Sequence, residues 1–392
     1  MNVAIITDSF PPMMDGVSRC ALGYAQALHD GGYGNCIVVT PRMPNVNREY
    51  PFPVYGFNSV GLPYAEYRAG HPFMPKLIKT LKDMKTDILH VHSPFISMTV
   101  ARQLRYILNI PIVFTQHTKW DFDIACAVSA KILCRGIERY AYNNLSAADE
   151  LWAVSRGAGE YLVNSGYKGD FIVMPNGTDF TRGDPDPEQA SQIRERFRLP
   201  AGVPVLLFVG RMIWYKNIAL LIDALKILHE RSFDFRMIFV GDGEDLPDIE
   251  KSAEAKGLEG IVGFTGRVSD RELLKAYYES ADLFVFPSVY DNAPLVVREA
   301  AACGCPSLVV SGSSASEILE NGETGFFADE NAESVADTIM SAFSDLGRLE
   351  KISEAASEQV YLPWDKVIER SVERYESVIN SYSRKSAPRI AR

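Results

Sequence analysis

The sequence predicts an α/β protein made of two Rossmann-like, doubly wound domains followed by one long helix. Its 392 residues leave room for two hydrophobic cores of roughly 150–200 residues each. Short apolar runs alternate with helical stretches along most of the chain. The alternation pauses at the charged stretch TRGDPDPEQA, residues 181–190, which is typical of a linker. We therefore place the first domain at residues 1–180, with a terminal helix at about 364–392, and the second domain at 181–363.

The strands expected in the first domain are apolar along their whole length. They occupy residues 3–9, 36–41, 87–94, 111–118, 150–157 and 170–177, with helices at 16–32 and 74–85. Strands of this kind are typical of parallel sheets that helices cover on both faces. The pattern therefore favours a doubly wound parallel sheet.

The second domain repeats the pattern, and a helix follows it. Its strands are expected at 203–212, 235–243, 261–268, 281–288 and 306–310, with helices between them. Residues 364–383 then form one long helix, since Val367, Val372, Tyr375, Val378 and Ile379 recur at helical spacing. The sheet of the second domain is complete before this point, so the helix is free to pack elsewhere.

Composition and charge exclude several classes of function. The net charge of −10 argues against a nucleic-acid partner. The charge is uneven: residues 1–178 hold 16 Lys and Arg against 14 Asp and Glu, and the remainder holds 24 against 36. The start lacks a signal peptide and no run could span a membrane, so we expect a cytoplasmic protein. The six cysteines form no CxxC pair, so we expect neither a zinc site nor disulfides.

Ligands of open α/β sheets bind at the carboxyl ends of the strands, so the loops there are the places to search. Gly16 follows the first strand and begins a helix, whose free N–H groups suit an anion. It could equally be an ordinary turn glycine, and no GxGxxG pattern surrounds it. Arg211 and Lys216 follow the strand at 203–212 and could grip both phosphates of a diphosphate. The alternative for each of these two is a solvated surface side chain.

The stretch DNAPLVVREAAACGCP, residues 291–306, predicts a short helix with a firm stop at Gly304 and Pro306. Pro294 suits its first helical position. The free N–H groups near Leu295 and Val296 favour an anion. The carboxylate of Glu299 stands on an otherwise apolar helix and therefore needs partners. Ribose hydroxyls are candidates, and the alternative is an ion pair with Arg298 or Arg211.

His117 ends the strand at 111–118, with Asp121 four residues later. A lone histidine is usually structural. This one would face the space between the domains if they close on each other, which favours a functional role.

Taken in order, these motifs resemble the retaining glycosyltransferases of family 4, which have the GT-B fold of two facing Rossmann-like domains. The resemblance covers nearly the whole chain. Its strongest mark is DNAPLVVRE, in which seven residues separate two acids, followed by SASEILENGETGFF. Further marks are FVGRMIWYKN, FVGDGED, GFTGRVSD, WAVSRG and MPNGTD. DGVS, HVHSPF and HTKWDFD are most similar to members that glucosylate or mannosylate membrane lipids.

The resemblance implies a role for each candidate residue. Arg211 and Lys216 would bind the donor diphosphate, Glu299 the ribose, and Asp291 the transferred sugar. Gly16 and His117 would approach the donor from the first domain, and the terminal helix would cross back to that domain. Further donor contacts are implied for Gly266, Arg267, Val268, Asn292, Leu295 and Val296.

The donor is expected to be a nucleotide-diphosphate sugar, with a UDP-sugar favoured and GDP-mannose as the alternative. Two departures from the family pattern bear on its identity: Asp291 replaces the usual glutamate, and NAP replaces a Gly-x-Gly turn. Arg211, Lys216 and a helix N-terminus could stabilise the leaving diphosphate, so no metal or other cofactor is expected. The motifs DFD (121–123) and DPD (184–186) are discounted as metal sites.

The acceptor is expected to be a lipid or a saccharide. Lys76, Lys79, Lys82 and Lys85 recur every three residues, and Arg102 and Arg105 follow on the next helix. This cationic face could contact an anionic membrane peripherally, or it could be only a solvated helix face. The segment 119–134 could border a lipid acceptor, but hydrophobic core is favoured.

Two alternatives to a transferase remain, a nucleotide-sugar epimerase and a non-catalytic nucleotide-sugar-binding subunit. The missing dinucleotide pattern disfavours a dehydrogenase. The length of the chain disfavours a pyridoxal-dependent phosphorylase.

Overall fold

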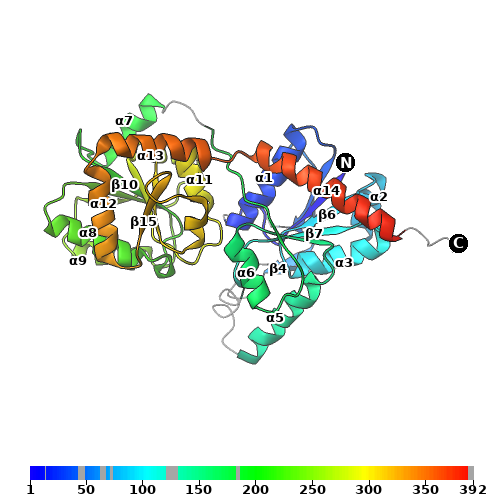
Figure 1. Cartoon of the computed structure of the whole chain (residues 1–392). Coiled ribbons are helices and arrows are strands. Elements are labelled where there is room, and N and C mark those ends of the chain that lie inside the picture. Colours follow the sequence, from blue (N-terminus) through cyan, green and yellow to red (C-terminus); the bar gives the residue numbers. More distant parts are fainter. Residues whose placement is uncertain are drawn as a thin grey trace. The chain divides into compact units, whose positions relative to one another are not determined.

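The computed structural model describes residues 1–13, 15–42, 49–61, 68–70, 74–120, 131–181 and 186–386. Contacts within the chain divide it into two units (Figure 1). The first unit comprises Met1–Gly177 with Trp364–Arg392, and the second comprises Thr178–Pro363. The sequence had suggested a boundary after residue 180. In the described part of the chain, no helix is both long and apolar enough to cross a membrane.

The first unit is built on a parallel sheet of seven strands in the order β3-β2-β1-β6-β7-β8-β9. The strands are β1 (Val3–Ile6), β2 (Cys36–Pro41), β3 (Val54–Phe57), β6 (Ile88–Val91), β7 (Ile112–Gln116), β8 (Glu150–Ala153) and β9 (Ile172–Val173). Its helices are α1 (Gly16–Asp30), α2 (Pro75–Asp83), α3 (Ile96–Leu108), α5 (Lys131–Leu145) and α6 (Arg156–Asn164). A small antiparallel pair, β4 (Ser59–Gly61) and β5 (Arg68–Gly70), was not expected from the sequence, and neither was β3.

The second unit has a parallel sheet of six strands in the order β12-β11-β10-β13-β14-β15. The strands are β10 (Val205–Val209), β11 (Arg236–Val240), β12 (Val262–Phe264), β13 (Leu283–Phe286), β14 (Ser307–Val310) and β15 (Gly325–Ala328). The helices are α7 (Pro187–Arg196), α8 (Ile218–Glu230), α9 (Leu246–Ala255), α10 (Arg271–Glu279), α11 (Leu295–Ala302), α12 (Ala332–Phe343) and α13 (Leu346–Gln359), with 3-10 turns η1 (Trp214–Lys216) and η2 (Ser314–Ile318). The sequence did not predict β15, and Pro187–Ala190 of the expected linker form the first turn of α7.

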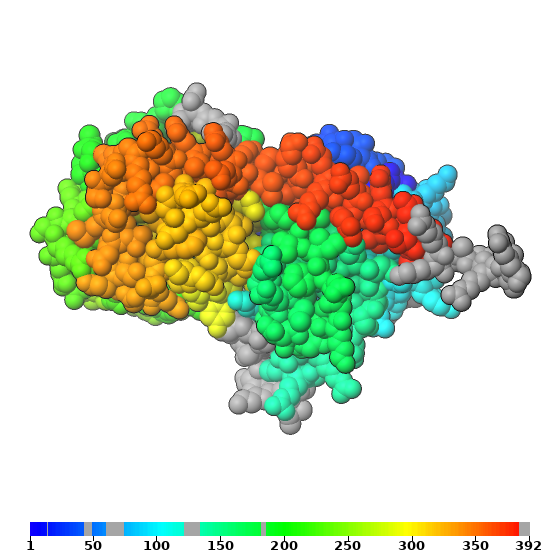
Figure 2. All heavy atoms as spheres, viewed as in Figure 1, coloured from blue at the N-terminus to red at the C-terminus, as the bar shows by residue number. Residues whose placement is uncertain are grey.

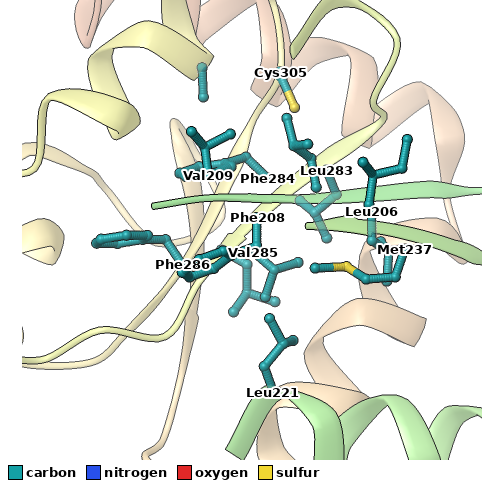
Figure 3. Close-up of a cluster of buried hydrophobic side chains, with 14 of the residues drawn as sticks. Leu206, Phe208, Val209, Leu221, Met237, Leu283, Phe284, Val285, Phe286 and Cys305 are labelled. Atoms are coloured by element: carbon teal, nitrogen blue, oxygen red, sulfur yellow. The ribbon is translucent and has the colours of Figure 1, made fainter. Parts of the chain in front are cut away.

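Both faces of this second sheet are covered, which explains why its strands are apolar throughout. Figure 3 shows side chains of β10 and β13 meeting those of β11 and α8 in the core. Phe286 stacks with Phe208 at 6.0 Å and with Phe284 at 5.7 Å between ring centroids. This packing fixes the strand ends from which the site loops leave.

The terminal helix α14 (Trp364–Ser386) belongs to the first unit, as the family resemblance implied (Figures 1 and 2). Gly23 of α1 makes room for it, because a Cβ there would lie 2.1 Å from Cε2 of Trp364. The hydroxyl of Tyr375 lies 2.6 Å from Nδ1 of His90 in the core of the unit. Nε of Arg374 donates to Oε1 of Glu150 at 3.1 Å.

Candidate active site

The strand order places Gly16 at the topological switch point of the first sheet and Lys216 and Asp291 at that of the second. His117 follows β7, one strand further along, and residues 266–268 follow the edge strand β12. The first strand of each unit, β1 or β10, lies between the strand that follows it in sequence and a strand that comes later. Loops at the carboxyl ends of such strands diverge and leave room for a ligand. In the first unit, Gly16 follows β1 and His117 follows β7. In the second unit the predicted residues follow β10, β12 and β13.

Lys216 and Asp291 form an ion pair at the switch point of the second unit. Lys216 ends η1, and its Nζ lies 6.0 Å from the ring centroid of Phe286 in β13. The hydroxyl of Ser288 donates to Oδ2 of Asp291 at 2.5 Å. The sequence singled out both charged residues but did not predict that they contact each other.

Arg211 pairs with a different carboxylate, that of Glu244. It follows β10 directly, and its Nη2 contacts Oε1 of Glu244 at 2.7 Å. Its side chain is about half exposed, at 46%. Of the two cations, Arg211 is the more accessible, since the side chain of Lys216 is only 14% exposed.

The helix predicted after Asp291 is α11, which is eight residues long. It begins at Leu295, and Pro294 is its N-cap with φ −65° rather than its first helical residue. No side chain caps the N-terminus, so the first N–H groups remain available to an anion. Asn292 is buried just before the helix. The helix ends where the sequence predicted, because Gly304 adopts a left-handed conformation with a φ of +70°.

Glu299 is 6% exposed and both of its oxygens accept hydrogen bonds. Oε1 accepts from Nη2 of Arg271 at 2.8 Å, and Oε2 accepts from the hydroxyl of Tyr278 at 3.1 Å. The expected alternative of an ion pair is therefore present, but the named partners were wrong. Arg298 instead donates to the carbonyl of Val360 at 2.6 Å, and burial lowers the pKa of its guanidinium to about 10.

The ends of β10, β11 and β12 pack tightly where the nucleotide base was predicted to lie. Gly241 has a φ of 144°, and a Cβ there would lie 1.9 Å from the carbonyl oxygen of Gly210. The amide of Gly241 donates to the carbonyl of Gly266 at 3.0 Å. Arg267 then projects into solvent, whereas Val268 packs partly against the core.

Gly16 begins α1 in open space, since a Cβ there would meet no atom within 4 Å. The preceding Asp15 caps the helix by accepting from the amide of Ser18 at 2.7 Å. Packing therefore does not require a glycine here, and the predicted contact with a donor remains a prediction.

A buried carboxyl that the sequence did not reveal lies beside this loop. Oδ1 of Asp8 accepts from the amide of Ser97 at 2.9 Å and from its hydroxyl at 2.6 Å, which caps α3. Burial raises the pKa of Asp8 to about 6, although these hydrogen bonds lower it. Asp8 therefore titrates close to neutral pH.

His117 is partly buried and lies beside two fully buried histidines, His90 and His92. Its Nε2 lies 2.9 Å from Nδ1 of His92, which follows β6. Nε2 of His90 lies 2.7 Å from the hydroxyl of Thr115. Burial lowers the pKa of His117 to about 3 and that of both neighbours well below the ordinary value, so all three are neutral at pH 7. The sequence signal that could have identified His92 is HVHSP, in which two histidines alternate with a valine at the end of a strand. Asp121, four residues after His117, lies outside the described residues.

Cys20, His92 and His117 place one possible metal ligand each within 4.8 Å of the others. Thiolate and imidazole are suitable ligands for zinc. The two ring nitrogens, however, are 2.9 Å apart, closer than the roughly 3.3 Å expected for two ligands on one tetrahedral zinc ion. Sγ of Cys20 also donates to Oδ1 of Asn176 at 2.8 Å. The arrangement is that of a hydrogen-bonded cluster.

The predicted cationic face of the first unit is only partly present. Lys76, Lys79 and Lys82 are exposed on α2, where Lys79 pairs with Asp83 at 2.6 Å, and Lys85 lies beyond the end of the helix. The arginines are engaged elsewhere. Arg102 donates to Asn144 at 2.8 Å, and Nη2 of Arg105 donates to Asp149 at 3.0 Å. Most of segment 119–134 lies outside the described residues.

Comparison with known proteins matches each half of the chain to a family model. The model of Glycosyltransferase Family 4 matches residues 14–182, and that of Glycosyl transferases group 1 matches residues 189–359. Alpha-monoglucosyldiacylglycerol synthase of Acholeplasma laidlawii is 23% identical over 356 residues, 86% of this chain and 87% of that protein. An uncharacterised glycosyltransferase of Methanocaldococcus jannaschii is 26% identical over 400 residues, 98% of this chain and 100% of that protein.

Among solved structures, HepE of Anabaena in complex with UDP has a TM-score of 0.77 to this chain. It is 20% identical, and the match covers 96% of this chain and 100% of that one. At this identity the likeness shows that the two chains share a fold.

Proposed function

We propose that this chain is a family 4 glycosyltransferase with the GT-B fold. In this proposal it moves a hexose from a nucleotide-diphosphate sugar to a lipid or saccharide acceptor and retains the configuration of the anomeric carbon. One observation carries the proposal. Lys216, Asp291 and the uncapped N-terminus of α11 lie together at the switch point of the second unit. A cation and free amides suit a diphosphate, and a carboxylate suits sugar hydroxyls.

The donor is bound by the second unit in this proposal. Lys216, Arg211 and the amides of Leu295 and Val296 hold the diphosphate, and Asp291 contacts the sugar. Glu299 accepts the ribose hydroxyls, while Gly266, Arg267 and Val268 adjoin the base. UDP-sugars are favoured because HepE, which has the same fold, binds UDP in its crystal structure, and GDP-mannose is the alternative.

The chemistry requires stabilisation of the charge that develops on the leaving diphosphate. Preorganised cations and helix amides provide this without a metal ion. The carboxylate of Asp291 holds the ammonium group of Lys216 beside α11, and in this proposal the same ammonium group contacts the diphosphate. Asn292 completes the proposed contacts of the second unit, and the roles predicted for Gly16 and His117 stay predictions.

The acceptor is proposed to be a lipid, with a saccharide as the alternative. The relative from Acholeplasma carries a name that specifies a diacylglycerol glycolipid product. The exposed lysines of α2 would hold the chain on the inner face of an anionic membrane, at about 1 kcal/mol for each charge near the surface. Vesicles with and without anionic lipid test this contact by co-sedimentation.

The decisive experiment combines binding with transfer. Thermal shift is measured with UDP, GDP, UDP-glucose, UDP-galactose, UDP-N-acetylglucosamine and GDP-mannose, each with and without EDTA. A ligand at 100 times its Kd adds about 2.7 kcal/mol of stability. The stabilising donor, radiolabelled in its sugar, is then incubated with diacylglycerol vesicles or with oligosaccharides.

Label in an acceptor, with the anomeric configuration of the donor, supports the proposed function. Conversion of the sugar without an acceptor identifies an epimerase instead. Binding with neither reaction favours a non-catalytic subunit, and the absence of any binding contradicts the proposed donor site.

A further inference from the structure

Arg271, which no sequence motif singled out, has contacts at two nitrogens and on one face of its guanidinium. It is the first residue of α10, and its Nη2 donates to Oε1 of Glu299 at 2.8 Å. The same Nη2 contacts Asp179, and Nε donates to Oδ2 of Asp179 at 3.1 Å. The flat face of the group lies 4.1 Å from the ring centroid of Phe180. These contacts leave the guanidinium in one orientation.

The arginine in turn determines how the carboxylate of Glu299 is oriented. Arg271 occupies one acceptor position on Oε1, and the hydroxyl of Tyr278 occupies one on Oε2. Each carboxylate oxygen can accept two hydrogen bonds, so one position on each oxygen remains. Two neighbouring oxygens with one free position each match the two neighbouring hydroxyls of a ribose.

Charge explains why Asp179 belongs to the arrangement. One arginine paired with Glu299 alone would neutralise it and weaken it as an acceptor. Because Arg271 is shared between two carboxylates, the group of three keeps a net charge of −1. Burial lowers the pKa of Arg271, but the two carboxylates outweigh burial and raise it, so the arginine stays charged.

We infer that Arg271 is a positioning residue that holds Glu299 for the ribose of the donor, and that the chain's preference for ribonucleotides over 2′-deoxyribonucleotides depends on it. The inference rests on the proposed function, since it assumes a nucleotide donor. Arg271 itself contacts neither the nucleotide nor the sugar in this arrangement. It acts through Glu299 and is held by Asp179.

The test compares Arg271→Gln with Arg231→Gln. Arg231 is a matched control, because it also lies in the second unit and pairs with two carboxylates, Glu333 and Asp337. Dissociation constants are measured calorimetrically for UDP and 2′-deoxy-UDP, and for GDP and 2′-deoxy-GDP. Steady-state kinetics with the donor sugar give KM and kcat for each variant.

The wild-type chain should prefer the ribonucleotide by about 10-fold or more, because hydrogen bonds to a charged acceptor are strong. Arg271→Gln should lower this preference to less than about 3-fold by weakening the ribonucleotide alone. Its donor KM should rise while kcat changes little, and Arg231→Gln should behave as wild type.

A folded Arg271→Gln chain that keeps the wild-type preference would overturn the inference. If that variant does not fold, Arg271→Lys replaces it. An ammonium group cannot reproduce the planar contacts to both carboxylates, so the preference should again fall, and an unchanged preference overturns the inference. A wild-type chain that binds both forms equally also overturns it, while leaving the transferase intact. A wild-type chain that binds no nucleotide contradicts the proposed function itself.

Discussion

Replacing Lys216 by alanine tests separately what this residue contributes to stability and what it contributes to the proposed transfer reaction. The side chains of Lys216 and Asp291 are 14% and 23% exposed, so their ion pair is partly buried. After the change Asp291 still accepts a hydrogen bond from the hydroxyl of Ser288, and water can reach the carboxylate of Asp291. We therefore expect the free energy of unfolding of the second unit to fall by about 1–2 kcal/mol, less than for a fully buried pair.

The expected loss of transfer is much larger. The ammonium group would stabilise the charge of the leaving diphosphate, and removing one such donor typically costs about 100- to 1,000-fold in kcat. Rates are measured with the donor that the binding experiment identifies. Urea unfolding of the same samples gives the change in stability.

Two further variants make the experiment decisive. Lys226→Ala is the control, because Lys226 is 45% exposed and its contact to Glu230 is 3.4 Å long. It should change neither rate nor stability. In Lys216→Ala the carboxylate of Asp291 has lost its cation, and the double variant with Asp291→Asn removes that unpaired charge. The double variant should therefore be more stable than Lys216→Ala, but it should remain inactive. A Lys216→Ala chain within about threefold of the wild-type rate would refute the assigned role, and no regain in the double variant would refute the ion-pair argument.

Gly23→Ala should destabilise the first unit by about 1–3 kcal/mol in urea unfolding, because the new methyl carbon would lie 2.1 Å from Trp364. Gly16→Ala is the control and should not destabilise it, because a methyl group there would meet no atom within 4 Å. Lowering the pH from 7 to 5 should reduce the free energy of unfolding. In the unfolded chain a histidine takes up a proton below about pH 6.5, whereas burial lowers the pKa of His117 in the folded chain to about 3. Each such histidine therefore lowers the free energy of unfolding by up to about 2 kcal/mol between pH 7 and pH 5. Burial raises the pKa of Asp8 to about 6, so protonation of Asp8 in the same pH range increases the free energy of unfolding by about 1 kcal/mol. The variant His117→Gln should therefore show a flatter pH dependence of stability, and a steeper one would contradict this reasoning. Transfer should persist in excess EDTA, and loss that Mg²⁺ or Mn²⁺ restores would show that a metal is needed.

The alternation of apolar strands and helices was sufficient to predict both parallel sheets, and the helical spacing of apolar residues predicted the terminal helix. It missed β15, because GFFA lies between turn-forming residues and is only four residues long. It also read Pro187–Ala190 as linker, although Asp186 caps a helix there. Short elements carry too few residues for a period to be visible, and the surrounding contacts decide them.

The sequence by itself determined which residue types follow the strands: it singled out Lys216 and Asp291 in the loops after two strands, and Glu299 on the helix after Asp291. Parallel strands joined by helices bring their carboxyl ends to one edge, so this proximity follows from the pattern. Only the tertiary structure decided the partners, since Lys216 meets Asp291 75 residues away and Arg271 meets Glu299 28 residues away. Which cation reaches which carboxylate depends on loop paths and side-chain packing between segments distant in sequence, and no local pattern records these.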